Sequence, residues 1–409
     1  MQLLVLAPVF PPRGGPGAIR YAHFCHHWAR TGHRVDVVTS AVGWHDDPGL
    51  LELLNVPGLE VHRVSPIGSG ERTRVQRARD WLKDPTIRSR GLRALSRVLK
   101  GLRDRWVVPD AHVYHLPAWL RQLEALVAER NYDALVTTSY PYSAHLAGAY
   151  LTERHATLPW MMELRDPWAG TNFRGRGNGL AASIDGVLEK FCLSRAKGVS
   201  VISDQMAELY RRRYPGVNVF VTPNGYVERP PLAPLPTRPP YKFCYTGSFD
   251  HNVSPATPIL RSLDDLLGQG TEVEFHWAGT ADLRSAEVLG EFARRWPDVL
   301  KSYGQVPFGE VHELWEHCHV LVLTLADGAP VLTTKAFEYL NCGRPVIAFV
   351  GEGELKSLLG RFSQVATTPP ASRADVETLL AQPTTRGNID EFSYRALAQS
   401  MIAQLEVLR

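Results

Sequence analysis

The sequence predicts an α/β protein with two doubly wound, Rossmann-like domains that face a common cleft. Patterns typical of strands and helices alternate along most of the 409 residues, as expected for parallel sheets covered by helices on both faces. The segment 229–240, RPPLAPLPTRPP, contains six prolines in twelve residues, so it can form neither a core helix nor a central strand. On each side of this segment the order strand, loop, helix begins anew, which indicates one domain on either side of a hinge.

The first domain is expected to cover residues 1–228. Residues 2–10 form an apolar run suited to a buried strand, and a loop rich in glycine and proline follows. The next residues carry an apolar stripe at helical spacing that ends at Gly32, and RVDVVTS at 34–40 reads as a second strand. The stripe consists of Ala18, Tyr21, Ala22, Cys25, Trp28 and Ala29.

The second domain is expected to cover residues 241–388. Its first strand is YKFCYTGSF, after which Ser254 is a suitable N-cap and Pro255 a suitable first residue of a helix that ends at Gly268. The residues 389–409 predict a C-terminal amphipathic helix, a candidate for packing back on the first domain. Further strands are expected at 273–279, 319–326 and 344–350.

Composition limits the functional classes. Hydrophobic residues make up 44 % and charged residues 21 %, which is typical of a globular rather than a disordered chain. No apolar run approaches the roughly 18 residues of a membrane-spanning helix, and MQLLVLAPVF lacks the basic leader of a signal peptide. Five scattered cysteines without a C-x-x-C pair favour free thiols in the cytoplasm. The net charge of +3 does not indicate a nucleic-acid partner.

Positive charge is concentrated in residues 71–105, where twelve Lys and Arg stand against four Asp and Glu. Leucines recur there at helical spacing, and Arg90, Arg93, Arg97 and Lys100 lie mostly on other faces. A cationic amphipathic helix of this kind can lie on an anionic membrane surface or receive an anionic ligand. The alternative is a core-packed helix with a solvated basic face.

The loops that follow the strands are the candidate ligand-binding segments, because ligands of open α/β sheets bind at the carboxyl ends of the strands. The first loop, PPRGGPG, offers Gly14 and Gly15 for a close backbone approach, and the following helix N-terminus favours an anionic group. It is neither a G-x-G-x-x-G fingerprint nor a Walker loop, and an ordinary turn is the simpler interpretation.

Two later loops of the first domain carry polar and aromatic side chains. TTSYPYSAHLAG at 137–148 would place Tyr140, Tyr142 and His145 at the edge of the cleft, although packing or capping would also account for the histidine. MMELRDPW at 161–168 places Arg165 and Asp166 in a turn that either serves the cleft or is held by their own ion pair. A Pro-Asn-Gly turn lies at 223–225, just before the proline segment.

The second domain offers the most distinctive stretch, PVLTTKAFEYLNCGRP at 330–345. Thr333 and Thr334 precede a helix whose first N–H groups, together with Lys335, would hold a pyrophosphate. Glu338, one turn further on the same face, would accept hydrogen bonds from ribose hydroxyls. The competing interpretation is a surface ion pair between Lys335 and Glu338, worth about 0.2–0.5 kcal/mol at this spacing.

Taken in order, the Gly14-Gly15 loop, SYPYSAHLAG, ELRDPW, the Pro-Asn-Gly turn and KAFEYLNCGRPVIA resemble the glycosyltransferases of the GT-B fold, and within them family 4, which retains anomeric configuration. The resemblance implies that the first domain binds the acceptor and the second the nucleotide-sugar donor, without a required metal or other cofactor. Glu338 matches the second glutamate of the family's E-x7-E motif, whereas Pro330 replaces the first.

The resemblance also implies residue roles. Gly247 lies in the donor loop TGSFDHNVSP, which lacks the family's Arg and Lys, and Val306 would lie beside the base. Asp166 would orient the acceptor hydroxyl or stabilise a cationic sugar, with Arg165 and His145 as further catalytic candidates and Tyr140 and Tyr142 as acceptor contacts. No D-x-D pair for a metal-bound nucleotide is present.

Three functions remain open on these grounds. The leading expectation is a glycosyltransferase in polysaccharide, glycolipid or natural-product glycan assembly, acting on a glycan, lipid-linked or small-molecule acceptor. A nucleotide-sugar-binding protein with a decayed site and a non-hydrolysing nucleotide-sugar epimerase are the alternatives. The free thiols and the lack of a signal peptide predict a cytoplasmic location. Peripheral attachment to the inner face of the membrane through 71–105 is a further hypothesis.

Overall fold

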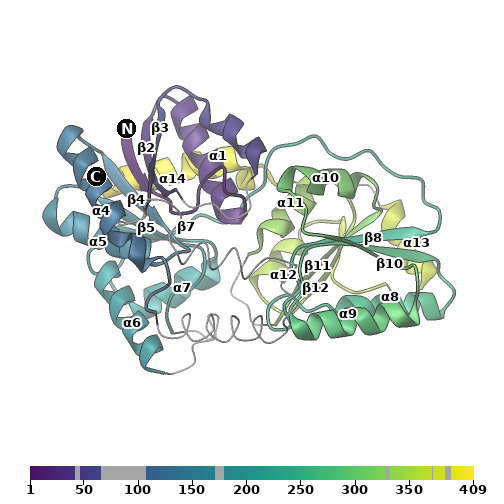
Figure 1. The fold of residues 1–409 in the computed structure, drawn as a ribbon. Helices are drawn as coiled ribbons and strands as arrows, with labels where there is room; N and C mark the ends of the chain where they lie inside the picture. The colour runs from purple at the N-terminus through teal and green to yellow at the C-terminus, as the bar shows by residue number, and fades with distance from the viewer. Residues whose placement is uncertain (42–46, 66–106, 171–178, 328–331, 371, 383–387) are drawn as a thin grey trace, which may run out of the picture.

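The structure, a computed structural model, describes residues 1–41, 47–65, 107–170, 179–327, 332–370, 372–382 and 388–409. These residues form two α/β domains (Figure 1), each built on an all-parallel sheet. The predicted fold class is therefore confirmed. The basic segment 71–105 and Pro330 lie outside the described residues.

The first domain has a seven-stranded sheet in the order β3-β2-β1-β4-β5-β6-β7. Its strands are β1 (Gln2–Leu6), β2 (Arg34–Ser40), β3 (Leu59–Val64), β4 (Ala134–Thr138), β5 (Trp160–Leu164), β6 (Gly198–Val201) and β7 (Val219–Val221). Its helices are α1 (Pro16–Arg30), α4 (Leu116–Glu129), α5 (Ser143–Arg154), α6 (Leu180–Leu193) and α7 (Asp204–Arg213), with short 3-10 turns at Pro48–Leu54 and Val113–His115.

The second domain has a six-stranded sheet in the order β10-β9-β8-β11-β12-β13. Its strands are β8 (Tyr241–Thr246), β9 (Val273–Ala278), β10 (Leu300–Gly304), β11 (Val320–Leu325), β12 (Val346–Val350) and β13 (Val365–Ala366). Its helices are α8 (Thr257–Gly268), α9 (Leu283–Arg295), α10 (Phe308–Glu316), α11 (Thr334–Cys342), α12 (Glu354–Leu359) and α13 (Arg373–Ala381). A 3-10 turn at Asp390–Phe392 leads into the last helix, α14 (Tyr394–Leu408).

The continuous apolar runs become central strands because both faces of each sheet are covered. In β1, Leu4 and Leu6 belong to one core cluster, whereas Leu3 and Val5 belong to the cluster on the opposite face. Side chains alternate between the two faces of a strand, so a strand buried on both sides reads as an unbroken apolar run.

Helix α8 begins three residues after the predicted N-cap. Asp250 and Ser254 form an antiparallel bridge, in which Ser254 N donates to Asp250 O over 2.8 Å. This bridge closes a small turn, so the helix starts only at Thr257, after Ala256 as N-cap. The predicted end at Gly268 agrees with the structure.

The chain crosses between the domains twice, and the two crossings lie side by side. Tyr226 pairs with Ser393 in a parallel bridge, with Tyr226 N donating to Phe392 O and Tyr394 N donating to Tyr226 O, both over 3.2 Å. The proline segment 229–240, predicted to be a hinge between the domains, is also bound to the second domain. Leu232 N donates to Cys342 O over 2.8 Å and Arg344 donates to Ala233 O over 2.7 Å, so this segment lies along the second domain.

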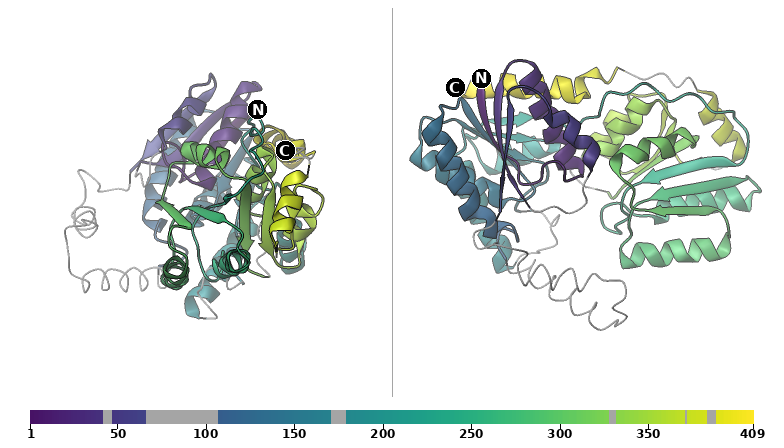
Figure 2. Two further views of the ribbon diagram at one scale, coloured as in Figure 1. Left: turned by 90° about the vertical axis from the view of Figure 1, so that its right-hand side faces the viewer. Right: turned by 45° about the horizontal axis from the view of Figure 1, so that its top comes forward.

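Helix α14 returns to the first domain, where it packs beside α1 and close to the N-terminal strand (Figure 2). Leu397, Met401 and Leu405 share a core cluster with Leu3 and Val5. The indole Nε1 of Trp28 donates to Ala398 O over 2.9 Å. Within the described segments, no helix is long and apolar enough to cross a bilayer.

Candidate functional site

The carboxyl ends of the two sheets face each other across the junction of the domains. Asn224, which follows β7, donates through Nδ2 to Leu332 O, just before α11, over 2.7 Å. The carboxylate of Glu354, at the start of α12, accepts from Asp204 N and Gln205 N at the start of α7, each over 2.9 Å. Because helices that follow parallel strands begin at the carboxyl edge of the sheet, these contacts place both edges at one site.

Gly247 and Lys335, both predicted to bind the donor, lie together at the end of β8. A Cβ atom at Gly247 would overlap the Nζ atom of Lys335, and the φ of +146° also favours glycine there. Lys335 Nζ donates to the hydroxyl of Tyr245 over 2.9 Å and lies 4.5 Å from the centre of that ring. The Tyr245 hydroxyl in turn donates to Ser248 O over 3.1 Å. The lysine ammonium is thus held at the carboxyl edge of the sheet.

The neighbouring strands β9 and β10 continue this edge through backbone hydrogen bonds. Gly247 N donates to Ala278 O over 2.8 Å, and Gly279 N donates to Gly304 O over 2.6 Å. At Gly279, where φ is +157°, a Cβ atom would overlap the carbonyl oxygen of Gly247. Val306, the residue expected beside the base, is half-buried just beyond this edge. Glycines therefore keep the backbones of β8 and β9 close together at this end, where Trp277 Nε1 also donates to Gly247 O over 3.1 Å.

Thr333 and Thr334 lie at the start of α11, as predicted. Thr333 is the N-cap, with extended backbone, and its side chain makes no capping hydrogen bond. Both threonines are half-buried. Since the N-terminus of a helix favours negative charge, this helix start and the Lys335 ammonium form a positively charged end of the site.

Glu338 lies on the same helix but does not face Lys335. Its side chain is 5 % exposed, and its carboxylate accepts from Val227 N, next to the interdomain crossing, over 3.1 Å. Burial raises the pKa of Glu338 to about 8, while the Val227 hydrogen bond and the charge of Arg229 act in the opposite direction. Among the described residues no ion pair joins Lys335 to Glu338, so the surface ion-pair interpretation does not describe this helix.

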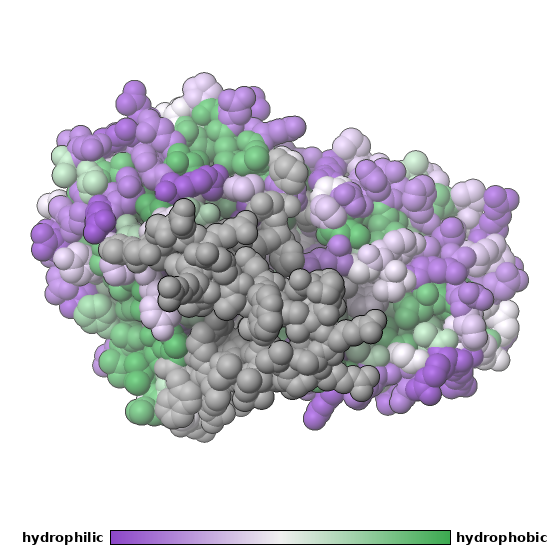
Figure 3. All heavy atoms as spheres, in the orientation of Figure 1, coloured by the Kyte–Doolittle hydropathy of each residue, from purple (hydrophilic) through white to green (hydrophobic). Residues whose placement is uncertain are grey.

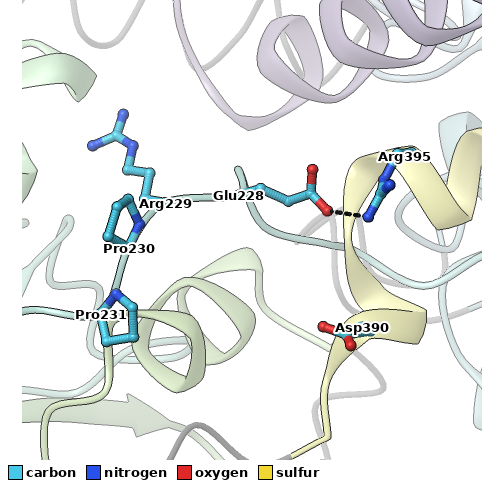
Figure 4. A pocket seen from close by; sticks show the side chains of 6 residues that line it. All are labelled: Glu228, Arg229, Pro230, Pro231, Asp390 and Arg395. Carbon is cyan, nitrogen blue, oxygen red and sulfur yellow. Dashed lines mark hydrogen bonds and ion pairs between the residues drawn. The ribbon is translucent and has the colours of Figure 1, made fainter.

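A pocket of about 440 Å³ opens at the crossing itself (Figure 4). Glu228 and Arg395 form an ion pair of 2.9 Å beside it, and Arg229 extends from the same segment in the direction away from that pair. The positive charge of Arg229 also lowers the pKa values of His23 in α1 and His312 in α10, after the larger effect of burial. The pocket, here called the hinge pocket, is completed by Pro230, Pro231 and Asp390.

On the first domain, Arg165 lies against the glycine-rich loop. Its Nε donates to Ser139 O over 2.6 Å, and a Cβ atom at Gly17 would come within 2.5–2.7 Å of its guanidinium group. Gly17 is thus the glycine of this loop that the arginine requires, a contact that the sequence reading did not find. Gly14 is half-buried, and Gly15 is exposed with a φ of +106° and open space around it.

Asp166 is half-buried in the loop after β5. Burial raises the pKa of its carboxyl group, and the charge of Arg165 acts in the opposite direction. The Tyr142 hydroxyl donates to the backbone of the same loop, over 3.2 Å to Pro167 O. A carboxylate with a raised pKa beside an arginine is suited to orienting a hydroxyl group.

The three ring residues of 140–145 separate into two environments. Tyr140 is 41 % exposed and lies edge-on to His112, with ring centres 5.6 Å apart. Tyr142 and His145 are buried instead of lying at the cleft edge as expected, because Trp168 from the next loop covers them, with ring centres 5.2 and 5.9 Å away. His145 Nδ1 bonds the Thr137 hydroxyl over 2.8 Å, and burial lowers its pKa to about 3.

Sequence reasoning missed a buried ion pair that joins helix α1 to strand β5 and to the turn after β7. Arg20 Nε donates to Glu163 over 2.7 Å, and both side chains are fully buried. Arg20 also donates to Pro223 O over 2.5 Å and to Thr222 O over 2.8 Å, which fixes the Pro-Asn-Gly turn. A glutamate inside the apolar run WMMEL was the available signal, because a buried carboxylate requires a partner. Tyr245, within an apolar strand, gave no signal.

One cluster in the second domain, beyond the end of β8, has side chains that could bind a metal. The side chains of Asp250, His251 and Asp282 bring ligand atoms within 4.8 Å of one another. They are already engaged locally: the His251 ring bonds the Asp282 carboxylate, which also accepts from Ser285 N over 2.7 Å as the cap of α9. The expected independence of metal stays a prediction.

The profile of a family described as "Glycosyl transferase 4-like domain" matches residues 14–225, just over half of the chain. Sucrose-phosphate synthase from Thermosynechococcus elongatus aligns over 100 % of this chain and 99 % of its own, with a TM-score of 0.67 and 17 % identity. HepE from Anabaena, solved in complex with UDP-glucose, aligns over 100 % and 97 %, with a TM-score of 0.58 and 13 % identity. TarM aligns over 99 % and 98 %, with a TM-score of 0.59 and 8 % identity.

At these identities the likeness to solved structures establishes the fold alone. No curated protein sequence matches this chain significantly.

Proposed function

Since this chain belongs to the glycosyl transferase 4-like family and has the two-domain GT-B fold, we propose that it transfers a sugar from a nucleotide-diphosphate sugar to an acceptor hydroxyl with retention of configuration. The observation that carries the proposal is the Lys335 ammonium, which Tyr245 holds at Gly247 beside the start of α11. A fixed cation at a helix N-terminus is what a diphosphate leaving group requires.

The donor diphosphate binds at this positive end. Cleavage of the sugar–phosphate bond leaves negative charge on the diphosphate, and preorganised N–H groups and an ammonium stabilise that charge where it develops. Thr333 and Thr334 contribute backbone N–H groups and Lys335 the ammonium. Gly247 keeps the backbone open for the diphosphate, and the edge from Gly279 to Val306 accepts the base.

The ribose binds next to Glu338. Its carboxyl group, with a pKa of about 8, is largely protonated at neutral pH in the free protein and can both donate to and accept from ribose hydroxyls. Its bond to Val227 N couples the ribose site to the crossing between the domains. Donor binding therefore favours one arrangement of the hinge.

The acceptor binds on the first domain between Tyr140 and the loop of Arg165 and Asp166. Asp166 orients the acceptor hydroxyl or stabilises the cationic sugar, and Arg165 holds Asp166 against the Gly17 loop. Tyr142 and His145 lie beneath this surface and support it by packing against Trp168. Closure of the cleft excludes water, which would otherwise hydrolyse the donor.

The reaction proceeds without a required metal or other cofactor, at the cytoplasmic face of a membrane. The acceptor is a glycan, a lipid-linked glycan or a small molecule, and the product enters polysaccharide, glycolipid or natural-product glycan assembly. The sequence 71–105, with its excess of eight positive charges, provides peripheral membrane contact.

The test is the thermal shift of the purified protein with UDP-, GDP-, ADP- and dTDP-sugars, followed by donor turnover with and without added chelator. Lys335→Met should abolish stabilisation by the one active nucleotide class. Lys242→Met, at the end of β8 opposite to the end that Lys335 contacts, is the matched control and should respond like the wild type.

Binding without transfer or slow hydrolysis would identify a nucleotide-sugar-binding protein, and epimerised donor would identify an epimerase. Equal stabilisation of the Lys335→Met variant would refute the assigned diphosphate site.

A further inference from the structure

Helix α6 has an exposed apolar stripe, and it buries its two acidic side chains, Asp185 and Glu189, beside Cys192 and Leu193. Leu180 and Val187 are each 68 % exposed, and Ile184 and Phe191 are exposed by more than a third. These four residues follow one another at intervals of four, three and four, so they line one face of the helix. Apolar surface gathers at the lower left of Figure 3, where α6 lies in Figure 1.

The inner face of α6 contacts the rest of the first domain through hydrogen bonds and an ion pair. Asp185 accepts from Trp168 Nε1 over 3.0 Å, and Glu189 accepts from Ala169 N over 3.2 Å and from the Tyr210 hydroxyl over 2.6 Å. Glu189 also pairs with Arg213 over 2.9 Å. Since these contacts fix the rotation of the helix, the apolar stripe cannot turn inward, and the exposure is a property of the native fold.

At the border of the stripe, arginine guanidinium groups lie over exposed aromatic rings. The Arg195 guanidinium lies 3.7 Å from the ring centre of Phe191, and on the adjacent helix α5 the Arg154 guanidinium lies 5.7 Å from that of Tyr150, which is also exposed. Rings and long cationic side chains that share an apolar border are typical of the membrane–water interface, where the ring enters the headgroup layer and the charge stays at its surface.

The charges beside the stripe are complementary to anionic headgroups. Lys190 is the charged residue that α6 exposes, and the chain from Lys190 to Ser203 has three basic residues and no acidic one. Nearby acids, Glu153 and Glu124, are paired with Arg195 and Arg154.

We propose that the outer face of α6, together with Tyr150 of α5, is a docking surface for an anionic lipid bilayer. The apolar stripe enters the headgroup layer, and Lys190, Arg195 and Lys197 contact lipid phosphates. Because the inner face of α6 bonds Trp168 and Ala169, docking places the loop that contains Asp166 next to the membrane. An acceptor carried by a lipid would then reach the site from the bilayer.

The test is flotation of the full chain with vesicles of phosphatidylcholine plus phosphatidylglycerol, and with vesicles of phosphatidylcholine alone. The wild type should float with the anionic vesicles, and the double variant Leu180→Gln/Val187→Gln should lose at least about tenfold in partitioning, since transfer of apolar side chains provides much of interfacial binding. The control, Leu283→Gln/Val407→Gln, removes two equally exposed apolar side chains, 70 % and 75 % exposed, on other helices and should float like the wild type.

Absence of wild-type flotation would overturn the proposal, as would equal flotation of the double variant. A dimer that the double variant abolishes in sedimentation velocity would assign the stripe to a second copy instead. The proposal does not depend on sugar transfer: donor-induced thermal shifts on the same samples report the donor site separately, and they should be unchanged in the double variant.

Discussion

The variant Glu338→Gln should be more stable than the wild type, by a margin that grows as the pH rises. The carboxyl group titrates near 4.5 when exposed and at about 8 in the folded protein, where it is buried. The folded state therefore holds a proton that the unfolded state has released, and stability falls with rising pH across this interval. Glutamine has similar shape, can still accept from Val227 N, and does not titrate.

The magnitude follows from the two pKa values. One unit of pKa corresponds to about 1.4 kcal/mol, so the free energy of unfolding of the wild type should fall by about 3.5 kcal/mol relative to that of Glu338→Gln between pH 5 and pH 8. Below pH 4.5 the two proteins should differ little. Above pH 8 the difference should level off, because both states of the wild type are then ionised.

The assay is urea unfolding at a series of pH values, followed by tryptophan fluorescence. Trp315 reports on this region, because its ring lies 5.3 Å from that of Tyr339 in α11. Glu352→Gln, at a surface residue with an 87 % exposed side chain, is the control and should follow the wild type at every pH. A difference between Glu338→Gln and wild type that does not change with pH would refute the assigned burial of this carboxyl group.

Four further changes probe the site. Lys335→Met should lower turnover of the donor about 10²–10³-fold, as loss of one preorganised charge-stabilising group does; unchanged steady-state turnover would exclude Lys335 from the diphosphate site. Gly279→Ala should lower the free energy of unfolding, measured by thermal unfolding, by about 1–3 kcal/mol or more, because it combines a disfavoured φ with backbone overlap at Gly247. The control Gly268→Ala, which has open space in α8, should leave it unchanged or raise it by up to about 1 kcal/mol. Glu354→Ala should release the contact between α12 and α7 and increase the radius of gyration in small-angle scattering; an unchanged radius would show that other contacts hold the domains. His145→Ala should cost about 3 kcal/mol through a core cavity yet leave turnover per folded molecule near the wild-type value, and loss of turnover in fully folded enzyme would restore a catalytic role.

The parallel sheets could be predicted because each strand is a short apolar run that is visible in the local sequence, and several such runs alternate with helical patterns. Strand β2 coincides with the expected RVDVVTS, and the expected runs at 273–279, 319–326 and 344–350 contain β9, β11 and β12. These inferences need only the periodicity of apolar residues. The approach of Lys335 to Gly247 was not predicted, because only the family resemblance pointed to Gly247.

The failures involve side chains whose environment is set by distant parts of the chain. Ser254 is a good N-cap in isolation, but its pairing with Asp250 takes it out of the helix. His145 reads as a cleft residue until Trp168, from another strand end, covers it. The composition of the proline segment indicates a hinge but not its contacts, and Arg344 binds its backbone from more than a hundred residues away. Local sequence carries none of these contacts.

The return of α14 to the first domain has a consequence for synthesis of the chain. Residues that complete the core around Leu3, Val5 and Trp28 are translated after the second domain, so the first domain is completed only after the second has been synthesised. Until then the apolar face that α14 covers stays exposed, while the second domain, continuous in sequence from 241, can already fold. A fragment ending at 228 would lack this cover, whereas one that joins 1–228 to 389–409 through a short linker would restore it.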